Sequence, residues 1–165
     1  MRGMRKDLPE IHFRPFAEGD VELLEAWLEG AGLGAPPWVS SETWGHRLMH
    51  DPRIICRAAY LPDGAVVAFL RLDVAPDRTA EVTVVVAPGW RDKGIGVLVI
   101  DDALAEARGM RLRRLVAVIK APNRPAQALF KISGFEPSGT EMPGYHHLER
   151  LIHSADHQPP LEIKP

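Results

Sequence analysis

A glycine-rich turn between a predicted strand and a predicted helix holds the residues of this chain that are best placed for chemistry. The β-branched, apolar run from Val82 to Val86 is typical of a buried strand, and Pro88 ends it. Arg91-x-x-Gly94-x-Gly96 follows, and a long helical pattern begins there. The first turn of a helix offers unpaired N–H donors and about half a positive charge, and glycine lets a ligand approach the main chain. The turn therefore predicts a site for a pyrophosphate group.

Two better-known phosphate-binding loops do not match this turn. A Walker loop has Lys and then Ser or Thr after its last glycine, whereas Ile95 follows Gly94 here. A dinucleotide-binding loop needs a third glycine at the position that Val99 occupies. The remaining alternative to a ligand site is an ordinary turn with exposed charges.

A second motif lies one predicted strand further along the chain. Its residues are Asn123, Ala126, Leu129, Phe130, Gly134 and Phe135. The first motif resembles the acetyl-CoA loop of the GNAT superfamily of acyl-CoA-dependent N-acetyltransferases, and the second resembles the helix of that family that ends in Gly-Phe. The two motifs also follow one another in the family's order. The resemblance covers residues 10–152.

Hydrophobic periodicity and turn residues predict one α+β domain with a mixed, mostly antiparallel central sheet. The Pro-Asp-Gly64 turn between two apolar runs is a strong hairpin signal, and a parallel strand–helix–strand crossover carries the glycine-rich turn. We expect a GNAT-like domain of about seven strands and about four helices. The expected strands are residues 11–16, 54–60, 65–73, 80–86, 115–119, a short one from 135, and 145–152; the expected helices are 20–29, 40–51, 94–108 and 126–133.

Composition and charge narrow the class of protein. The net charge of −2 argues against a general surface for nucleic acid or acidic membranes. Cys56 is the only cysteine, and its apolar neighbours predict a small core residue rather than a nucleophile or a disulfide partner. No apolar stretch approaches the roughly 20 residues that span a bilayer, and no secretory pattern is seen, so we expect a cytoplasmic protein without a metal site. Residues 1–9 are expected to be an extension, 10–152 the domain and 153–165 a loose tail.

The resemblance implies that acetyl-CoA is the co-substrate and lies in a V-shaped opening between the strands 80–86 and 115–119. The cofactor-binding residues would be Val84, Val85, Val86, Arg91, Asp92, Lys93, Gly94, Ile95, Gly96, Asn123, Ala126 and Phe130. The three valines would pair through their main chain with the pantetheine arm, and the glycine-rich turn would hold the pyrophosphate. Asn123 would hydrogen-bond the amides of the arm, whereas Leu129 is expected to pack within the fold.

The implied reaction is direct transfer of the acetyl group to a primary amine through a tetrahedral oxyanion, which the N–H of Val85 or Val86 would stabilise. The two proton transfers differ in cost. Freeing a lysine-like amine with a pKa near 10.4 costs about 4.6 kcal/mol at pH 7, whereas forming a thiolate from a thiol with a pKa near 8.5 costs about 2 kcal/mol. A general base should therefore matter more than a general acid.

Glu81 is the first candidate for the base, because it lies in the strand that leads to the glycine-rich turn, where several family members keep a carboxylate. The alternative interpretation is a glutamate on the solvent face of the sheet. His146 and His147 have suitable intrinsic pKa values and are further candidates. The family's usual acid is a tyrosine where this chain has Phe130, so either the thiolate departs unaided, or Tyr145 or a water supplies the proton.

The sequence leaves the acceptor amine open. Residues 30–50 and 137–147 are expected to form the wall opposite the donor. The candidates for contact are Trp38, Trp44, His46, Tyr145 and His146. Two other functions stay open: a non-catalytic acyl-CoA-binding module, and transfer of a longer acyl group if Ala117 and Ala126 widen the thioester end. The expected partners are an acyl-CoA and an amine, and the resemblance also allows a homodimer.

Overall fold

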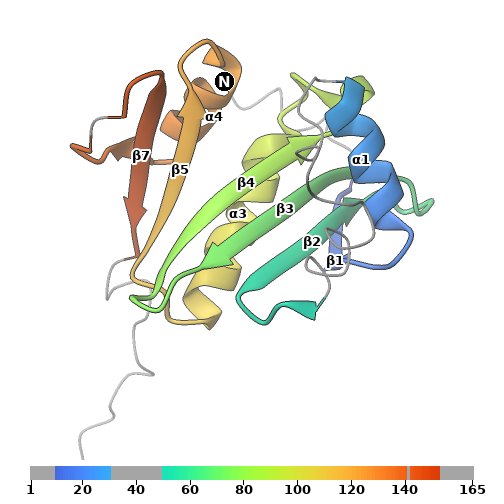
Figure 1. The fold of residues 1–165 in the computed structure, drawn as a ribbon. Coiled ribbons are helices and arrows are strands. Elements are labelled where there is room, and N and C mark those ends of the chain that lie inside the picture. Colours follow the sequence, from blue (N-terminus) through green and yellow to red (C-terminus); the bar gives the residue numbers. More distant parts are fainter. Residues whose placement is uncertain (1–9, 31–49, 141, 153–165) are drawn as a thin grey trace, which may run out of the picture.

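The computed structural model describes residues 10–30, 50–140 and 142–152 of the chain. A seven-stranded sheet forms its centre, in the order β1-β2-β3-β4-β5-β7-β6 (Figure 1). The strands are β1 (His12–Pro15), β2 (Ile54–Tyr60), β3 (Val66–Val74), β4 (Thr79–Val86), β5 (Arg114–Lys120), β6 (Glu136–Pro137) and β7 (Tyr145–Leu151). The helices are α1 (Asp20–Gly30), α3 (Ile95–Gly109) and α4 (Arg124–Ile132), with a single 3-10 turn, η2 (Pro88–Trp90), after β4.

The predicted fold class is confirmed, because the sheet is mixed and mostly antiparallel with helices packed against it. Three α-helices lie within the part of the chain that the structure describes. The predicted helix at 40–51 falls almost entirely on residues outside that part, as do the predicted extension at 1–9 and the predicted tail at 153–165. Most strand bounds differ from the predicted ones by a single residue, which is the usual uncertainty at the end of an element.

The parallel pairing of β4 with β5 is short. It contains the register pairs Thr79↔Arg114, Ala80↔Leu115 and Glu81↔Val116. On its other edge, β4 stays paired with β3 as far as Val86, opposite Ala68. The two central strands therefore diverge beyond Glu81, and Figure 1 shows the resulting V between them. The V-shaped opening expected from the resemblance is present in the fold.

Helices cover the two faces of the sheet differently. Figure 1 shows α1 on the near face and α3 behind the sheet. The main core lies on the α3 side, where alternate residues of β4 such as Ala80 and Val82 are buried. On α3, Val97 is only half-buried, whereas Val99 is fully buried. The buried stripe runs Ile95, Gly96, Val99, Ile100, Ala103, Leu104 and Ala107.

A buried ion pair fixes the start of α1 over the near face. The Asp20 side chain is nearly fully buried, and its carboxylate accepts hydrogen bonds from Arg14 Nη1 at 2.7 Å and Arg14 Nη2 at 3.0 Å. The same carboxylate accepts from the Ala17 N–H at 2.7 Å. Charge-assisted bonds of this kind are stronger than neutral ones. The helix then lies with the Trp27 ring 4.9 Å from the Phe69 ring of β3, so α1 forms a wall above the sheet.

Candidate active site

The glycine-rich turn has the backbone geometry that a phosphate site requires. Gly94 immediately precedes α3 and has φ 81° and ψ 3°, a left-handed conformation that costs L side chains about 1 to 2 kcal/mol. Asp92 is also left-handed, with φ 58°, which aspartate tolerates better than most residues. These two turns bring the chain from η2 into α3 and leave the first N–H groups of the helix at the bend. A helix N-terminus of this kind favours an anion.

A cavity of about 530 Å³ lies between the divergent strands, the glycine-rich turn and α4. Ten of the twelve predicted cofactor residues line it: Val84, Val85, Val86, Arg91, Asp92, Gly94, Ile95, Gly96, Asn123 and Ala126. Trp90 and Trp27 also line it, and neither was predicted to. Trp90 lies within the turn itself, so its position next to Arg91 was the available signal. The two predicted motifs thus meet at one site, although Gly96 and Asn123 lie 27 positions apart in the sequence.

Lys93 and Phe130 are the two predicted cofactor residues that do not line this cavity. The Lys93 Nζ lies 5.3 Å from the centre of the Trp90 ring, in a cation–π contact. Phe130 is 5% exposed and belongs to the main core, where its ring meets that of Phe135 edge-on at 5.0 Å. The packing of the helix end against the following strand accounts for the position of Phe130, and we correct its predicted role to that of a core residue.

The main chain of β4 offers two residues to the opening. The Ala87 N–H donates to the Val67 carbonyl at 2.8 Å, and the β3–β4 register continues from there without a bulge. Because alternate residues of an antiparallel strand turn their N–H and C=O groups to opposite edges, Val85 bonds toward β3. Val84 and Val86 therefore turn toward the opening, and the Arg91 Nε donates to the Val86 carbonyl at 3.3 Å. Of the two predicted oxyanion donors, this geometry retains Val86 and excludes Val85.

Helix α4 packs tightly against the start of α3. A Cβ atom at Gly96 would lie 2.8 Å from Leu129 Cδ2, which is too close for an undisturbed contact. Gly96 therefore serves close helix packing as well as the turn, and Leu129 packs against the main core as expected. The Asn123 Oδ1 accepts a hydrogen bond from the Ala126 N–H at 3.2 Å and caps α4. The amide group of Asn123 remains at the rim of the cavity.

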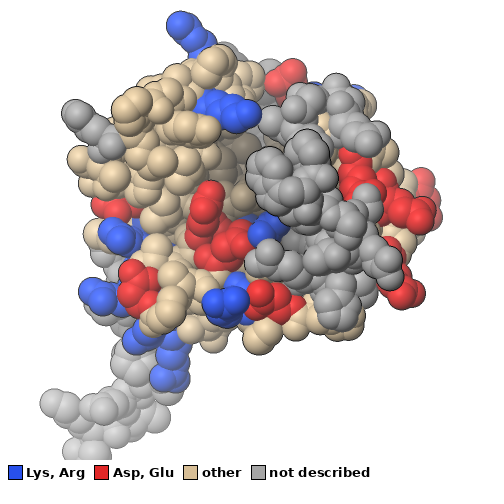
Figure 2. Space-filling view, viewed as in Figure 1, with Lys and Arg blue, Asp and Glu red and all other residues tan. Residues whose placement is uncertain are grey.

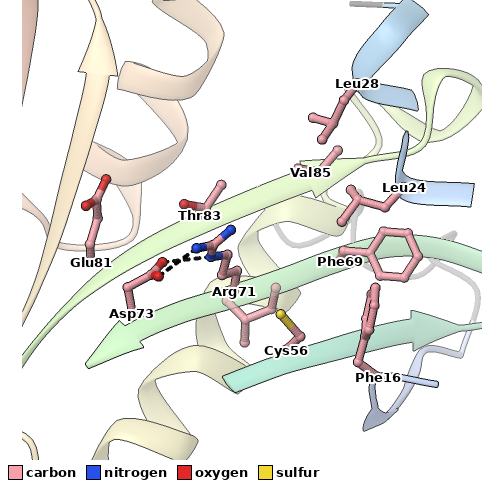
Figure 3. A pocket seen from close by; sticks show the side chains of 11 residues that line it. Phe16, Leu24, Leu28, Cys56, Phe69, Arg71, Asp73, Glu81, Thr83 and Val85 are labelled. Carbon is pink, nitrogen blue, oxygen red and sulfur yellow. Dashed lines mark hydrogen bonds and ion pairs between the residues drawn. The ribbon is translucent and has the colours of Figure 1, made fainter. Parts of the chain in front are cut away.

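A second cavity, of about 370 Å³, lies on the α1 face of the sheet (Figure 3). One end is apolar and is formed by side chains from α1, the chain before it and the strands beneath. The other end is polar and comes from β3 and β4. The lining residues are Phe16, Leu24, Leu28, Cys56, Phe69, Leu70, Arg71, Asp73, Glu81, Thr83 and Val85. Leu28 and Val85 line both cavities, so the two cavities adjoin at these residues.

Glu81 belongs to the polar end of this second cavity, on the face opposite the main core. Partial burial of its carboxyl raises the pKa of Glu81, and the negative charge of Asp73 raises it further. Arg71 and His147 act in the opposite direction and are weaker influences. Glu81 is exposed overall while its carboxyl is partly desolvated, so its surroundings fit the predicted base as well as the predicted glutamate on the solvent face. A raised pKa brings a carboxylate closer to the range that suits a general base.

Arg71 and Asp73 are site residues that the sequence analysis missed. Arg71 Nε donates to Asp73 Oδ2 at 2.9 Å, and Arg71 Nη2 donates to Asp73 Oδ1 at 2.8 Å. Asp73 is also the register partner of Glu81 across the β3–β4 hairpin. Figure 2 shows acidic and basic side chains side by side in the middle of this face. The available signal was the alternation Arg71-x-Asp73 in a strand joined to Glu81 by a short turn.

Tyr145 lies away from Glu81. It is 44% exposed and pairs with Lys120, whereas Glu81 pairs with Val116 on the same strand. Four residues along a strand correspond to about 13 Å, so the two predicted catalytic residues are not brought together. Both histidine candidates join Tyr145 around a third cavity near the β6–β7 connection, of about 520 Å³.

His147 is the histidine that lies nearer to Glu81. It pairs with Val118, which lies two residues along β5 from Val116, the partner of Glu81. The His147 Nδ1 lies 2.5 Å from Ser138 Oγ. His146 is exposed on the opposite face of β7. The remaining acceptor-wall candidates, Trp38, Trp44 and His46, lie outside the residues that the structure describes.

The structure describes residues 10–30, 50–140 and 142–152. Within these ranges no group of three or more His, Cys, Asp or Glu side chains is arranged to hold a metal ion. No helix in the same ranges has the length and apolar character that crossing a bilayer requires.

Comparisons with known proteins agree with this geometry. A family model described as the acetyltransferase (GNAT) family matches residues 4–135. The chain is 28% identical over 134 residues to the uncharacterized N-acetyltransferase YfmK of Bacillus subtilis, covering 78% of this chain and 87% of that protein. It is 33% identical over 97 residues to mycothiol acetyltransferase of Beutenbergia cavernae, but this match covers 58% of the chain and only 31% of that longer protein.

Among solved structures, the fold resembles the spermidine N-acetyltransferase from Vibrio cholerae in complex with CoA and spermine. The TM-score is 0.73, and the match covers 86% of this chain and 95% of that chain. Sequence identity is 17%, so this likeness concerns the fold alone.

Proposed function

Because the chain belongs to the acetyltransferase (GNAT) family, we propose that it moves an acetyl group from acetyl-CoA to a primary amine by direct transfer. One observation carries the proposal: two cavities of opposite character meet at Leu28 and Val85. The first is bounded by a helix N-terminus and divergent strands, which suit a pyrophosphate and an extended arm. The second holds a carboxyl with a raised pKa, which suits an amine.

In this proposal the donor lies along the opening between β4 and β5. The pyrophosphate meets Arg91 and the N–H groups at the start of α3, and the pantetheine arm pairs with the free edge of β4. The thioester then lies toward the closed end of the V, where β4 and β5 part beyond Glu81. The N–H of Val86 or Val84, both facing the opening, stabilises the oxyanion that forms there.

The acceptor approaches from the α1 face. Its proton passes to the Glu81 carboxylate, directly or through one water, and the neutral nitrogen attacks the thioester carbon. The new C–N bond forms, the attacking nitrogen loses its second proton to water, the C–S bond breaks, and CoA leaves as the thiolate. Glu81 then returns its proton to solvent.

The thiolate leaves without a protein acid in this proposal. Phe130 has no proton to give, and Tyr145 lies about 13 Å along the sheet from the row of Glu81. Forming the thiolate costs only about 2 kcal/mol at neutral pH, so the thiolate can leave without a proton from the protein. Water entering the open V supplies the proton afterwards.

A longer acyl donor has less support than acetyl-CoA. Ala117 is fully buried in the main core and does not line the donor cavity, so its small side chain does not widen the thioester end. Ala126 lines the cavity beside Leu129 on α4. We therefore keep acetyl as the proposed group.

A cytoplasmic location and a homodimer also belong to this proposal, the first supported by the single, buried cysteine.

The decisive experiment combines calorimetry with a thiol-release assay. Calorimetry should detect acetyl-CoA binding, and thiol release should depend on both acetyl-CoA and an added amine. Tight binding without amine-dependent thiol release would identify a non-catalytic acyl-CoA-binding module instead. Failure of acetyl-CoA and CoA to bind at millimolar concentration would overturn both interpretations.

A further inference from the structure

The acceptor cavity carries a charge pattern that limits which amines fit it. Its titratable groups, apart from the Cys56 thiol, are one guanidinium, Arg71, and two carboxylates, Asp73 and Glu81. Arg71 and Asp73 neutralise each other through two hydrogen bonds. No described residue forms an ion pair with Glu81. The cavity therefore has one net negative charge when Glu81 is ionised, which balances one ammonium group.

The guanidinium of Arg71 is committed to Asp73. Its Nε and Nη2 form one of the two edges with which a guanidinium can bind a carboxylate, and Asp73 occupies that edge. A carboxylate on the acceptor would lie beside Asp73 and Glu81, while Asp73 already balances the charge of Arg71. Repulsion between the carboxylate of the acceptor and these two carboxylates disfavours binding. A carboxylate that enters the cavity without a countercharge also loses its hydration.

The other end of the cavity is built from apolar side chains. The Phe16 ring lies edge-on to the Phe69 ring at 5.3 Å, and Leu24 and Leu28 of α1 close the same side. Figure 3 shows these side chains at one end, with Arg71, Asp73 and Glu81 at the other. A bound molecule would therefore place its charged group on β4 and its apolar group under α1.

We propose that the acceptor is a primary amine with a single positive charge, a compact apolar or aromatic arm and no carboxylate. This inference rests on the proposed function and adds the class of acceptor to it. The ammonium lies at Glu81, and the arm lies against Phe16 and Phe69. Polyamines, with further charges along their length, would place ammonium groups against the apolar end, so they are poor acceptors.

Four probes separate these features: 2-phenylethylamine, L-phenylalanine, ethylamine and spermidine, each tested with acetyl-CoA by thiol release. 2-Phenylethylamine and L-phenylalanine differ only in the carboxylate. We expect kcat/KM for 2-phenylethylamine to exceed that for each of the other three by at least about tenfold. Equal or higher kcat/KM for L-phenylalanine or spermidine would overturn the acceptor class.

Two variants locate the preference in this cavity. Phe16→Ala should lower the preference for 2-phenylethylamine over ethylamine by about tenfold, because it removes the aromatic wall. Thr83→Asp should raise the ratio of spermidine to 2-phenylethylamine relative to Thr83→Asn, since only the aspartate adds a negative charge at the same size. Unchanged ratios in both variants would refute the site.

Acetyl-CoA binding, measured separately by calorimetry, distinguishes the two levels of the argument. Donor binding without thiol release from any of the four amines would overturn the acceptor class and leave the donor site standing. Loss of donor binding itself would overturn the proposed function.

Discussion

Asp73 and Glu81 lie opposite each other on neighbouring strands, and the structure gives a guanidinium partner to Asp73. Two carboxylates in this relation repel each other, so one of them gains a proton more readily than it would alone. Arg71 pairs with Asp73, and the pKa of Glu81 is raised. The two carboxyls therefore differ in their surroundings, because one is bound to a guanidinium and the other has no ion-pair partner among the described residues.

Glu81→Gln should lower kcat at pH 7 by about 10²- to 10⁴-fold, the usual contribution of a general base. Raising the pH should reduce the difference in kcat between the variant and the parent. Below the pKa of the amine, each unit of pH increase makes its free form about tenfold more abundant. Steady-state thiol release between pH 6 and 10 measures the effect. A deficit that stays constant across this range would contradict the role of base.

Glu81→Gln should lower kcat but should not lower the free energy of unfolding at pH 7. Because the folded pKa of Glu81 lies above the unfolded value of 4.5, the folded state holds the proton more tightly, and the free energy of unfolding falls as pH rises between the two values. Glu81→Gln removes this loss, so we expect the variant at pH 7 to be as stable as the parent or more stable. Urea unfolding at pH 4 and pH 7 tests this. A variant that is less stable at pH 7 would show that Glu81 mainly supports the fold.

Gly94→Glu should abolish measurable binding of CoA, since its carboxylate would occupy the anion position at the start of α3. Its left-handed backbone should also cost about 1 to 2 kcal/mol of stability. Gly89→Glu is the matched control, because an added Cβ there meets no atom within 4 Å. Calorimetry and thermal unfolding of both variants make the comparison. Equal CoA affinity in the Gly94 variant and its control would refute the pyrophosphate site.

Phe130→Tyr should leave turnover unchanged, although it introduces the tyrosine that the family resemblance implies at this position. Phe130 packs against Phe135 in the core, so the added hydroxyl would be buried and should cost about 1 to 3 kcal/mol unless it finds a partner. Kinetics with acetyl-CoA and chemical denaturation measure the two effects. A turnover several-fold higher would show that the hydroxyl reaches the donor and that acid assistance limits the rate.

Cys56 should react slowly with alkylating reagents. It lies between the two ends of the acceptor cavity, and burial raises the pKa of its thiol to about 11. At pH 8 roughly one thiol in a thousand is then ionised, so iodoacetamide should label it far more slowly than it labels free cysteine. Mass spectrometry of the native and the urea-unfolded chain provides the rates. Labelling of the native chain as fast as that of the unfolded chain would contradict the burial.

Local patterns in the sequence were sufficient for much of the fold. Apolar runs and the Pro-Asp-Gly64 turn predicted β2 to β4 to within about one residue at each end, because strands alternate and tight turns demand particular residues. The donor cavity followed as well, since its two motifs are each local. The buried face of α3 could not be predicted from the sequence, because a helix with apolar residues on most of its turns can pack in more than one rotation about its axis. The contact of Gly96 with Leu129 selects one of these rotations.

The acceptor side could not be predicted from local patterns. Alternation indicates that Arg71, Asp73 and Glu81 share faces within their own strands, but only the pairing register places them together. The same limit applies to Tyr145, whose distance from Glu81 depends on the register of β7 with β5. The edge toward which each N–H and C=O group of β4 points also depends on the register. The sequence therefore could not separate Val85 from Val86 as the predicted oxyanion donor.

The seam between β4 and β5 consists of three residue pairs, so the sheet is in effect two half-sheets hinged at Glu81 and Val116. A pantetheine arm lying in the V would extend that seam and brace the halves against each other. In hydrogen–deuterium exchange, the amides of Val84 and Val86 should then slow when donor is added, while that of Val85, already bonded to β3, changes little. Under the proposed function, donor occupancy would thereby be tied to the stiffness of the whole sheet.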